Sequence, residues 1–202
     1  MKELLSQLRC VLFATLILAL VCCGLYPLIV FGVAQCLFPE KANGSLIFDK
    51  SGSVRGSRLL GQGFTAEKYF HPRPSVAGNG YDGTSSGGSN LGPTSQKLYD
   101  AIKERAGAYR QENHLPPEQP IPADAITTSG SGLDPHISPA NAELQARRVA
   151  RARGLSEQDI RALINQHIEG PDLGMLGDSG VNVLTLNLAL DSLGAEQSGV
   201  RR

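Results

Sequence analysis

Residues 84–95, with the sequence TSSGGSNLGPTS, have the composition that most directly indicates chemistry. Two adjacent glycines lie between small hydroxyl residues, and a stretch with helical periodicity follows. Backbone N–H groups in such a loop can converge on a phosphate, and an anion is favoured where a helix begins. The loop is therefore a candidate site for an anion or nucleotide, or for contact with another protein. Its candidate residues are Ser85, Ser86, Gly87, Gly88, Ser89, Asn90 and Gly92.

A second glycine- and serine-rich segment, SGSGLDPHISP, spans residues 129–139. Zinc takes about three or four protein ligands, so Asp134 and His136 alone do not predict a metal site. A hydrolase triad of Ser131, Asp134 and His136 is disfavoured because near neighbours in sequence rarely reach that geometry. We expect Asp134 to cap a turn and His136 to bond the backbone. The segment is also a candidate partner-contact loop, with residues Ser129, Gly130, Ser131, Gly132, Asp134 and His136.

Two nucleotide-binding patterns match only in part. GNGYDG at 78–83 has the spacing of the dinucleotide fingerprint, but prolines precede it and no strand leads into it. GTSSGGSN at 83–90 has the glycine spacing of a P-loop, but Ser89 and Asn90 occupy the positions of the lysine and the hydroxyl residue that contact phosphate and magnesium. The sequence therefore predicts no catalytic residue, no metal and no cofactor of the chain's own.

The segment that positions this domain is apolar, with no charged residue from Val11 to Phe38. About 20 apolar helical residues cross the roughly 30 Å hydrocarbon layer. A cleavable signal peptide has an apolar core of about 7 to 15 residues, and the small residues at 32–34 come too late for its cleavage site. We predict an uncleaved transmembrane helix over 11–38, kinked at Pro27.

The charges beside this helix bear on its orientation. Lys2 and Arg9 against Glu3 favour a cytoplasmic N-terminus over 1–10. The domain over 39–193 is then extracytoplasmic. A disordered tail is predicted for 194–202.

Composition excludes several functional classes. All 4 cysteines, at positions 10, 22, 23 and 36, lie in or beside the apolar segment, so the domain has no disulfide and no thiolate metal site. The chain carries 19 basic and 19 acidic residues, so no global field recruits nucleic acid.

The remaining pattern predicts a single mixed, loop-rich α/β domain after the transmembrane helix. Residues 53–62 are expected to contain a strand, 69–83 and 114–122 to be irregular, and 181–184 to be extended. A helix is expected from Pro93, with Leu98, Ile102 and Tyr109 on one face.

Three helix boundaries are better marked. Ser138 and Pro139 are expected to open a helix that Gly154 ends, and Ser156 to begin the next one. Residues 185–193 fit either a strand or a helix.

Several motifs, in this order after the anchor, carry a resemblance to a known family. They are GSRLLGQGF, YFHPRPS, SSGGSNLGPTS, SGSGLDPHISP, RVARARGL and VNVLTLNLALD. Together they resemble the KdpC family, the C subunit of the Kdp-type potassium-transporting P-type ATPase. The likeness runs from the anchor almost to the end of the chain. Ser95 departs from the family, which usually has Asn there.

The resemblance implies a non-catalytic subunit of a bacterial inner-membrane pump. Its implied partners are a potassium-binding channel-like subunit, a P-type subunit that hydrolyses ATP and a small peptide subunit. The implied role is that of a catalytic chaperone that raises the ATP affinity of the hydrolysing subunit, and the family description also attributes ATP binding to the C subunit. We expect no cofactor of the chain's own, with ATP bound through the hydrolysing partner subunit. The soluble domain is implied to lie outside the cytoplasm.

An extracytoplasmic loop cannot touch cytoplasmic ATP, so its effect on ATP affinity would be a coupling between distant sites of about 1 to 3 kcal/mol. We therefore expect the two glycine-rich loops to form a surface that docks on the channel-like subunit and shapes its outer potassium entrance. One alternative is a membrane-anchored nucleotide- or phosphate-binding module that uses the Ser-Gly-Gly loop. Another is that the glycines only permit tight turns.

Overall fold

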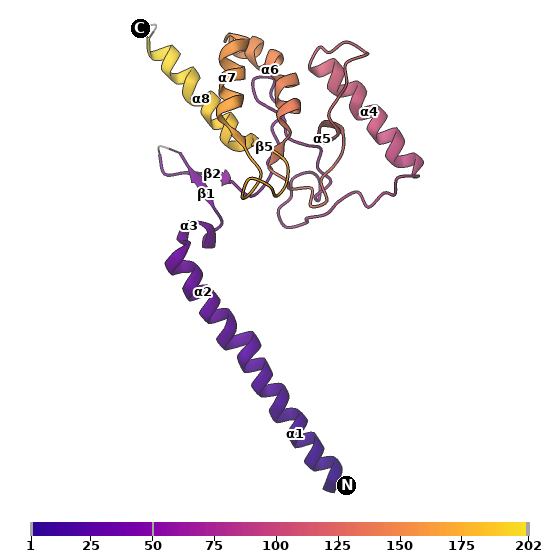
Figure 1. Ribbon diagram of the computed structural model, residues 1–202, viewed down its shortest axis with the longest axis vertical. Helices are drawn as coiled ribbons and strands as arrows, with labels where there is room; N and C mark the ends of the chain where they lie inside the picture. The colour runs from indigo at the N-terminus through magenta and orange to yellow at the C-terminus, as the bar shows by residue number, and fades with distance from the viewer. Residues whose placement is uncertain (1, 50, 201–202) are drawn as a thin grey trace. The chain divides into compact units, whose positions relative to one another are not determined.

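The computed structural model describes residues 2–49 and 51–200, with side chains placed for residue 3, residues 6–49 and residues 51–193. The chain divides into two compact units, Met1–Leu46 and Ile47–Arg202 (Figure 1).

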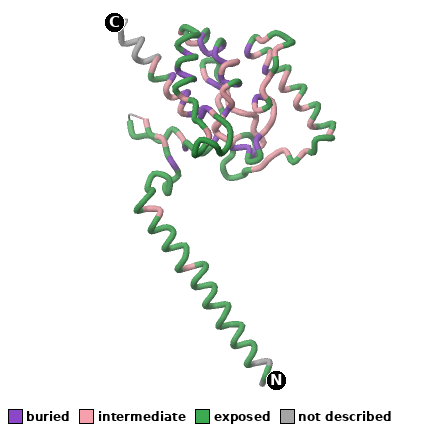
Figure 2. The backbone as a smooth tube through the Cα atoms, in the orientation of Figure 1, coloured by how far each residue is buried: buried purple, intermediate pink, exposed green. Residues whose placement is uncertain are grey.

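The first unit is a helical segment whose described residues are mostly exposed, with Ser45 buried near its end (Figure 2). Helix α1 (Lys2–Ala19) passes through a π-helical segment, η1 (Leu20–Leu25), into α2 (Tyr26–Leu37), and the short α3 (Pro39–Ala42) follows. Residues Ser6–Leu37 are long and apolar enough to cross a membrane, and an 18-residue window within them has a mean hydropathy of 2.6. The prediction of one N-terminal transmembrane helix is confirmed.

The π-helical segment ends at Leu25, two residues before Pro27. Proline has no N–H to donate and its ring displaces the carbonyl four residues earlier, here that of Cys23. A wider turn accommodates that displacement without ending the helix.

The second unit contains two small sheets. Strands β1 (Leu46–Phe48) and β2 (Val54–Ser57) form one of them. The other is antiparallel with the order β3-β5-β4, from β3 (His136–Ile137), β5 (Gly180–Asn182) and β4 (Ile168–Glu169).

Five helices complete this unit: α4 (Gln96–Glu112), α5 (Ala123–Ile126), α6 (Pro139–Arg153), α7 (Glu157–Gln166) and α8 (Val183–Val200). In Figure 1, α6 and α7 lie side by side next to α8, while α4 lies apart with α5. The buried residues gather where α6, α7, α8 and β5 meet (Figure 2). The apolar core there includes Phe70, Ile137, Ala146, Val149, Ile160, Ile164, Val181, Leu186 and Leu190.

The ends of α6 and α7 follow from local capping. Ser138 Oγ accepts from Asn141 N, Pro139 takes the first helical position, and Gly154 ends α6 in the left-handed region with φ 65°. Ser156 Oγ likewise accepts from Asp159 N at the start of α7. The mixed α/β class is confirmed, as are the predicted start and end of α6 and the predicted start of α7.

Two segments differ from the prediction, the start of α4 and the C-terminal tail. For a third, residues 185–193, the structure decides between the two predicted states. Helix α4 begins at Gln96, not at Pro93, because Ser95 is extended. Residues 185–193 are helical, and the Asn182 side chain accepts from Thr185 N at 3.2 Å where β5 gives way to α8. Helix α8 continues to Val200, where the sequence predicts a disordered tail over 194–202. Residues 201 and 202 lie outside the described part of the chain.

The buried side chain of Arg148 connects the loop that leads into Phe70 with the end of α4 and with α6. The Arg148 side chain is 3% exposed. It donates to the carbonyl oxygen of Tyr69 at 2.9 Å, to Asn113 Oδ1 at 3.0 Å and to Gln145 Oε1 at 2.8 Å, and also to the Glu67 carbonyl oxygen. A buried cation with these acceptors fixes the path of the chain into Phe70.

Candidate functional site

The two glycine-rich segments that the sequence singles out lie against each other. Gly87 N donates to the carbonyl oxygen of Ser131 at 2.8 Å, and Ser86 Oγ donates to the same oxygen at 3.0 Å. We call residues 85–92 and 129–134 together the loop pair. Its two halves are thus one structural feature.

Glycine is required where the two halves approach most closely. Gly132 has φ 69°, and a Cβ there would lie 2.7 Å from the carbonyl oxygen of Gly87 and 2.9 Å from Ala77 N. A Cβ on Gly88 would lie 3.0 Å from the carbonyl oxygen of Gly130. By contrast, a Cβ on Gly87 or Gly130 would meet nothing within 4 Å. The turn-forming role considered for the glycines therefore fits Gly132, while Gly88 allows the close approach of the two backbones.

Residues 73–81, which precede the first half of the loop pair in sequence, form hydrogen bonds that hold the second half in place. Ser75 Oγ donates to the carbonyl oxygen of Gly132 at 2.6 Å and accepts from Tyr81 N at 2.9 Å. The Tyr81 hydroxyl donates to the carbonyl oxygen of Arg73 at 2.6 Å, and burial raises its pKa to about 12. These bonds hold residues 73–81 in an irregular path, as predicted for 69–83.

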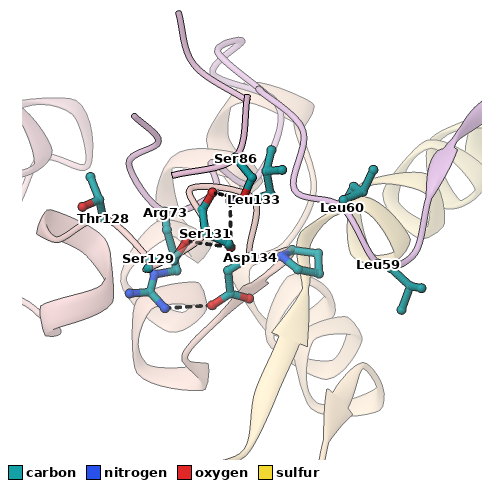
Figure 3. Close-up of a pocket in the computed structure, with 11 residues that line it drawn as sticks. Leu59, Leu60, Arg73, Ser86, Thr128, Ser129, Ser131, Leu133 and Asp134 are labelled. Carbon is teal, nitrogen blue, oxygen red and sulfur yellow. Dashed lines mark hydrogen bonds and ion pairs between the residues drawn. The ribbon is translucent and has the colours of Figure 1, made fainter. Parts of the chain in front are cut away.

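A cavity of about 740 Å³ opens beside the loop pair. Figure 3 shows three of its hydroxyl groups, from Ser86, Ser129 and Ser131, near the middle of the pocket, with Thr128 on one side and the exposed leucines, Leu59 and Leu60, on the other. The wall is therefore polar where the loops meet and apolar at one edge, so it offers both hydrogen-bonding groups and apolar side chains to a partner.

Asp134 lines this cavity and binds both Arg73 and the backbone of His136. Its Oδ2 accepts from Arg73 Nη1 at 2.8 Å, and its Oδ1 accepts from His136 N at 3.0 Å, which confirms its predicted capping role. The His136 side chain and backbone N–H, together with Arg73, hold the pKa of Asp134 at about 2.

His136 differs from the prediction. Its side chain bonds carboxylates instead of the backbone, with Nε2 at 3.1 Å from Glu169 Oε2 and Nδ1 at 3.6 Å from Asp134 Oδ1. The pairing arises because β3 and β4 both flank β5. Asp134 first, and Glu169 second, raise the pKa of His136 against the opposing effect of burial.

We expect stability to fall as the pH rises through the raised pKa of His136. Its stabilising effect is complete below the unfolded value of about 6.5 and is lost above the folded value. Replacing His136 with Gln should flatten this part of the profile, measured by chemical unfolding of the full chain in detergent at several pH values. His114→Asn, at an exposed histidine with φ 52°, is the matched control. Equal slopes in the wild type and the His136 variant would contradict the expectation.

The remaining candidate residues are placed as follows. Ser85 N donates to the carbonyl oxygen of Asp82 at 3.1 Å, and Asn90 adopts φ 52°. Ser89 is half-buried, and Gly92 accepts from Ser95 N at 3.0 Å. Residues 91–95 separate Asn90 from the first turn of α4.

Sequence reasoning missed Arg73 and Glu169. Neither has a local signal, because each reaches the site through a contact distant in sequence, Arg73 with Asp134 and Glu169 with His136. Among the described residues, no group of three or more His, Cys, Asp or Glu side chains is placed to hold a metal ion.

A profile of the family described as "K+-transporting ATPase, c chain", KdpC, matches residues 8–192. The chain belongs to the KdpC family. The match includes the membrane-spanning helix and both halves of the loop pair.

Named KdpC proteins resemble the chain over most of their length. The "Potassium-transporting ATPase KdpC subunit" of Mycobacterium tuberculosis (strain H37Rv) is 54% identical over 192 residues, covering 95% of this chain and 99% of that protein. The protein of the same name from Koribacter versatilis is 52% identical over 190 residues, covering 94% of each. That from Caulobacter vibrioides is 58% identical over 167 residues, covering 83% of each.

Proposed function

We propose that this chain is a non-catalytic accessory subunit of a potassium-transporting P-type ATPase. It assembles with and stabilises a complex of a potassium-binding channel-like subunit, an ATP-hydrolysing subunit and a small peptide subunit. In that complex it raises the ATP affinity of the hydrolysing subunit. The naming of the relatives as subunits of such a pump supports the proposal.

The observation that carries a docking role is the pairing of the two loops through Ser131. Segments 45 residues apart in sequence form one surface with hydroxyl groups, exposed leucines and a fixed ion pair. Such a surface suits contact with a protein better than a buried structural role. We propose that the loop pair docks on the channel-like subunit, where it covers or tunes the outer potassium entrance.

The orientation proposed with this role places the N-terminus in the cytoplasm of a bacterial inner membrane and the domain outside. ATP then acts only at the partner subunit. The chain would influence that distant site by binding one conformation of the complex more tightly, and a bias of about 1 to 3 kcal/mol suffices.

The alternative is a nucleotide- or phosphate-binding module built on the Ser-Gly-Gly loop. The Gly87 N–H already donates to Ser131, and residues 91–95 separate the loop from the start of α4. An anion cradle needs free amides that converge, and the helix dipole acts mainly within the first turn. These features favour the docking role.

Single cysteines test the docking role and the orientation together. In a background without the four native cysteines, Ser86→Cys places a thiol on the loop pair, and Gln158→Cys places one on the exposed side of α7 as a control. An impermeant thiol reagent on intact cells should label both when the chain is expressed alone. Co-expression with the other pump subunits should protect only position 86.

Two results would count against the proposal. Labelling of both positions only after lysis would place the domain in the cytoplasm and favour the nucleotide-binding alternative. Equal labelling of position 86 with and without the other subunits, in a complex that copurifies, would remove the loop pair from the interface.

A further inference from the structure

The connection between β4 and β5 exposes apolar side chains to an unusual degree. Leu173 is 89% exposed, Met175 is 80% and Leu176 is 57%, and the first two are the most exposed large apolar side chains in the described part of the chain. We call residues 170–179 the β4–β5 tip. Single exposed apolar residues are common on proteins, but three within four positions are not.

The tip is an ordered turn with its own hydrogen bonds. Asp172 and Leu176 exchange backbone hydrogen bonds of 2.9 Å in both directions, and Gly174 N donates to the carbonyl oxygen of Pro171 at 3.0 Å. Leu173 adopts φ 55°, a conformation that is costly for a bulky side chain. The turn thus keeps Leu173 in a strained conformation, although its 89% exposed side chain gains little packing within the described part of the chain.

The charges around the tip indicate which kind of surface it can bind. Asp172 and Asp178 are exposed, and neither forms an ion pair with any residue that the structure describes. Two unpaired carboxylates beside the apolar residues are repelled by anionic lipid headgroups. They favour instead a protein surface with an apolar pocket and basic side chains at its rim.

The tip also borders the loop pair. Leu176 and Asp178 line a cavity of about 710 Å³ whose wall includes Arg73 and Asp134. The same ion pair lines the cavity beside the loop pair. His136, at the base of the loop pair, contacts Glu169, from which the chain enters the tip. The two surfaces are therefore continuous.

We propose that the β4–β5 tip is a second docking element, which inserts Leu173 and Met175 into an apolar pocket rimmed by basic side chains on a partner subunit of the pump. This inference rests on the proposed function. Removing two large apolar side chains from water is favourable in proportion to the apolar area buried, and Met is enriched at protein interfaces. The carboxylates then set the orientation and the salt dependence of the contact.

The test uses the full chain co-expressed with the other pump subunits. The double variant Leu173→Asn with Met175→Ser removes the apolar tip, and Asn tolerates the left-handed conformation at position 173. Tyr99→Ser is the control, because Tyr99 on α4 is 61% exposed and distant from the tip in sequence. We expect the double variant to lower recovery of the complex about tenfold or more and the control to leave it unchanged.

A second variant distinguishes loss of binding from loss of folding. Asp172→Lys with Asp178→Lys leaves the apolar residues in place and should lower recovery while the free chain unfolds at the same denaturant concentration as the wild type. If the wild type itself forms no complex, the proposed function fails. If the wild type assembles and the tip variants assemble equally well, the function stands and this inference is overturned.

A lipid-binding tip would give a different pattern. A polarity-sensitive dye on Met175→Cys, in the background without native cysteines, reports its surroundings in vesicles of anionic phospholipid that contain the chain alone. A blue shift there, with normal assembly of the tip variants, would assign the tip to the membrane and overturn a protein partner. A blue shift only on addition of the other subunits supports the proposal.

Discussion

Replacing Arg148 with Met should lower the free energy of unfolding of the domain by about 3 to 5 kcal/mol. Methionine fills much of the same volume, so the loss comes from hydrogen bonds. The substitution removes one donor from each of four acceptors: the carbonyl oxygens of Glu67 and Tyr69, and the amide oxygens of Asn113 and Gln145. Of these, Gln145 Oε1 still accepts from His71 N at 2.7 Å. These acceptors lie on three separate segments, so the loop that leads into Phe70 should loosen from α4 and α6.

Chemical unfolding of the full chain in detergent measures this effect. Arg147→Met is the matched control, because Arg147 is exposed on the same helix and its loss should change stability by about 0.5 kcal/mol or less. Equal stabilities of the two variants would mean that the Arg148 hydrogen bonds add nothing beyond what water supplies.

Replacing Gly132 with Ala should destabilise the domain by about 2 to 4 kcal/mol. The new methyl group would lie 2.7 Å from the carbonyl oxygen of Gly87 and 2.9 Å from Ala77 N, and both obstacles are backbone atoms that cannot rotate away. The left-handed φ of 69° adds strain for any residue with a Cβ. The two halves of the loop pair should therefore separate, with loss of the bonds to Ser131.

Gly130→Ala is the control for this prediction. It is the same change two residues away, at a position where a Cβ meets nothing within 4 Å. The two variants are compared by chemical unfolding of the full chain in detergent. A stable Gly132 variant would show that the loops can shift without cost, whereas a defect in both variants would point to flexibility of the whole segment.

Elements with local signals could be predicted from the sequence. The ends of α6 follow from Ser138, Pro139 and Gly154, each of which acts on its own stretch of backbone. The start of α4 was misplaced because Pro93 fits a first helical turn, while the extended Ser95 delays the helix. Residues 185–193 stayed ambiguous because their apolar pattern fits both a strand and a helix.

The candidate site could be predicted only in part. Both halves of the loop pair were identified, and their family resemblance is confirmed. The hydrogen bonds from Gly87 and Ser86 to Ser131 could not be predicted, because they depend on how residues 73–81 pack against the second half. The pairing of His136 with Glu169 depends on β3 and β4 flanking the same strand, which no spacing in the sequence indicates.

The π-helical segment Leu20–Leu25 changes which residues the anchor presents along its length. A π turn adds one residue to the helical repeat, so the residues beyond it are rotated by about 100° relative to those of an uninterrupted α-helix. A straight neighbouring helix that follows one stripe of α1 therefore meets a different stripe on α2. The anchor can thus face one neighbour in one leaflet of the bilayer and another in the opposite leaflet.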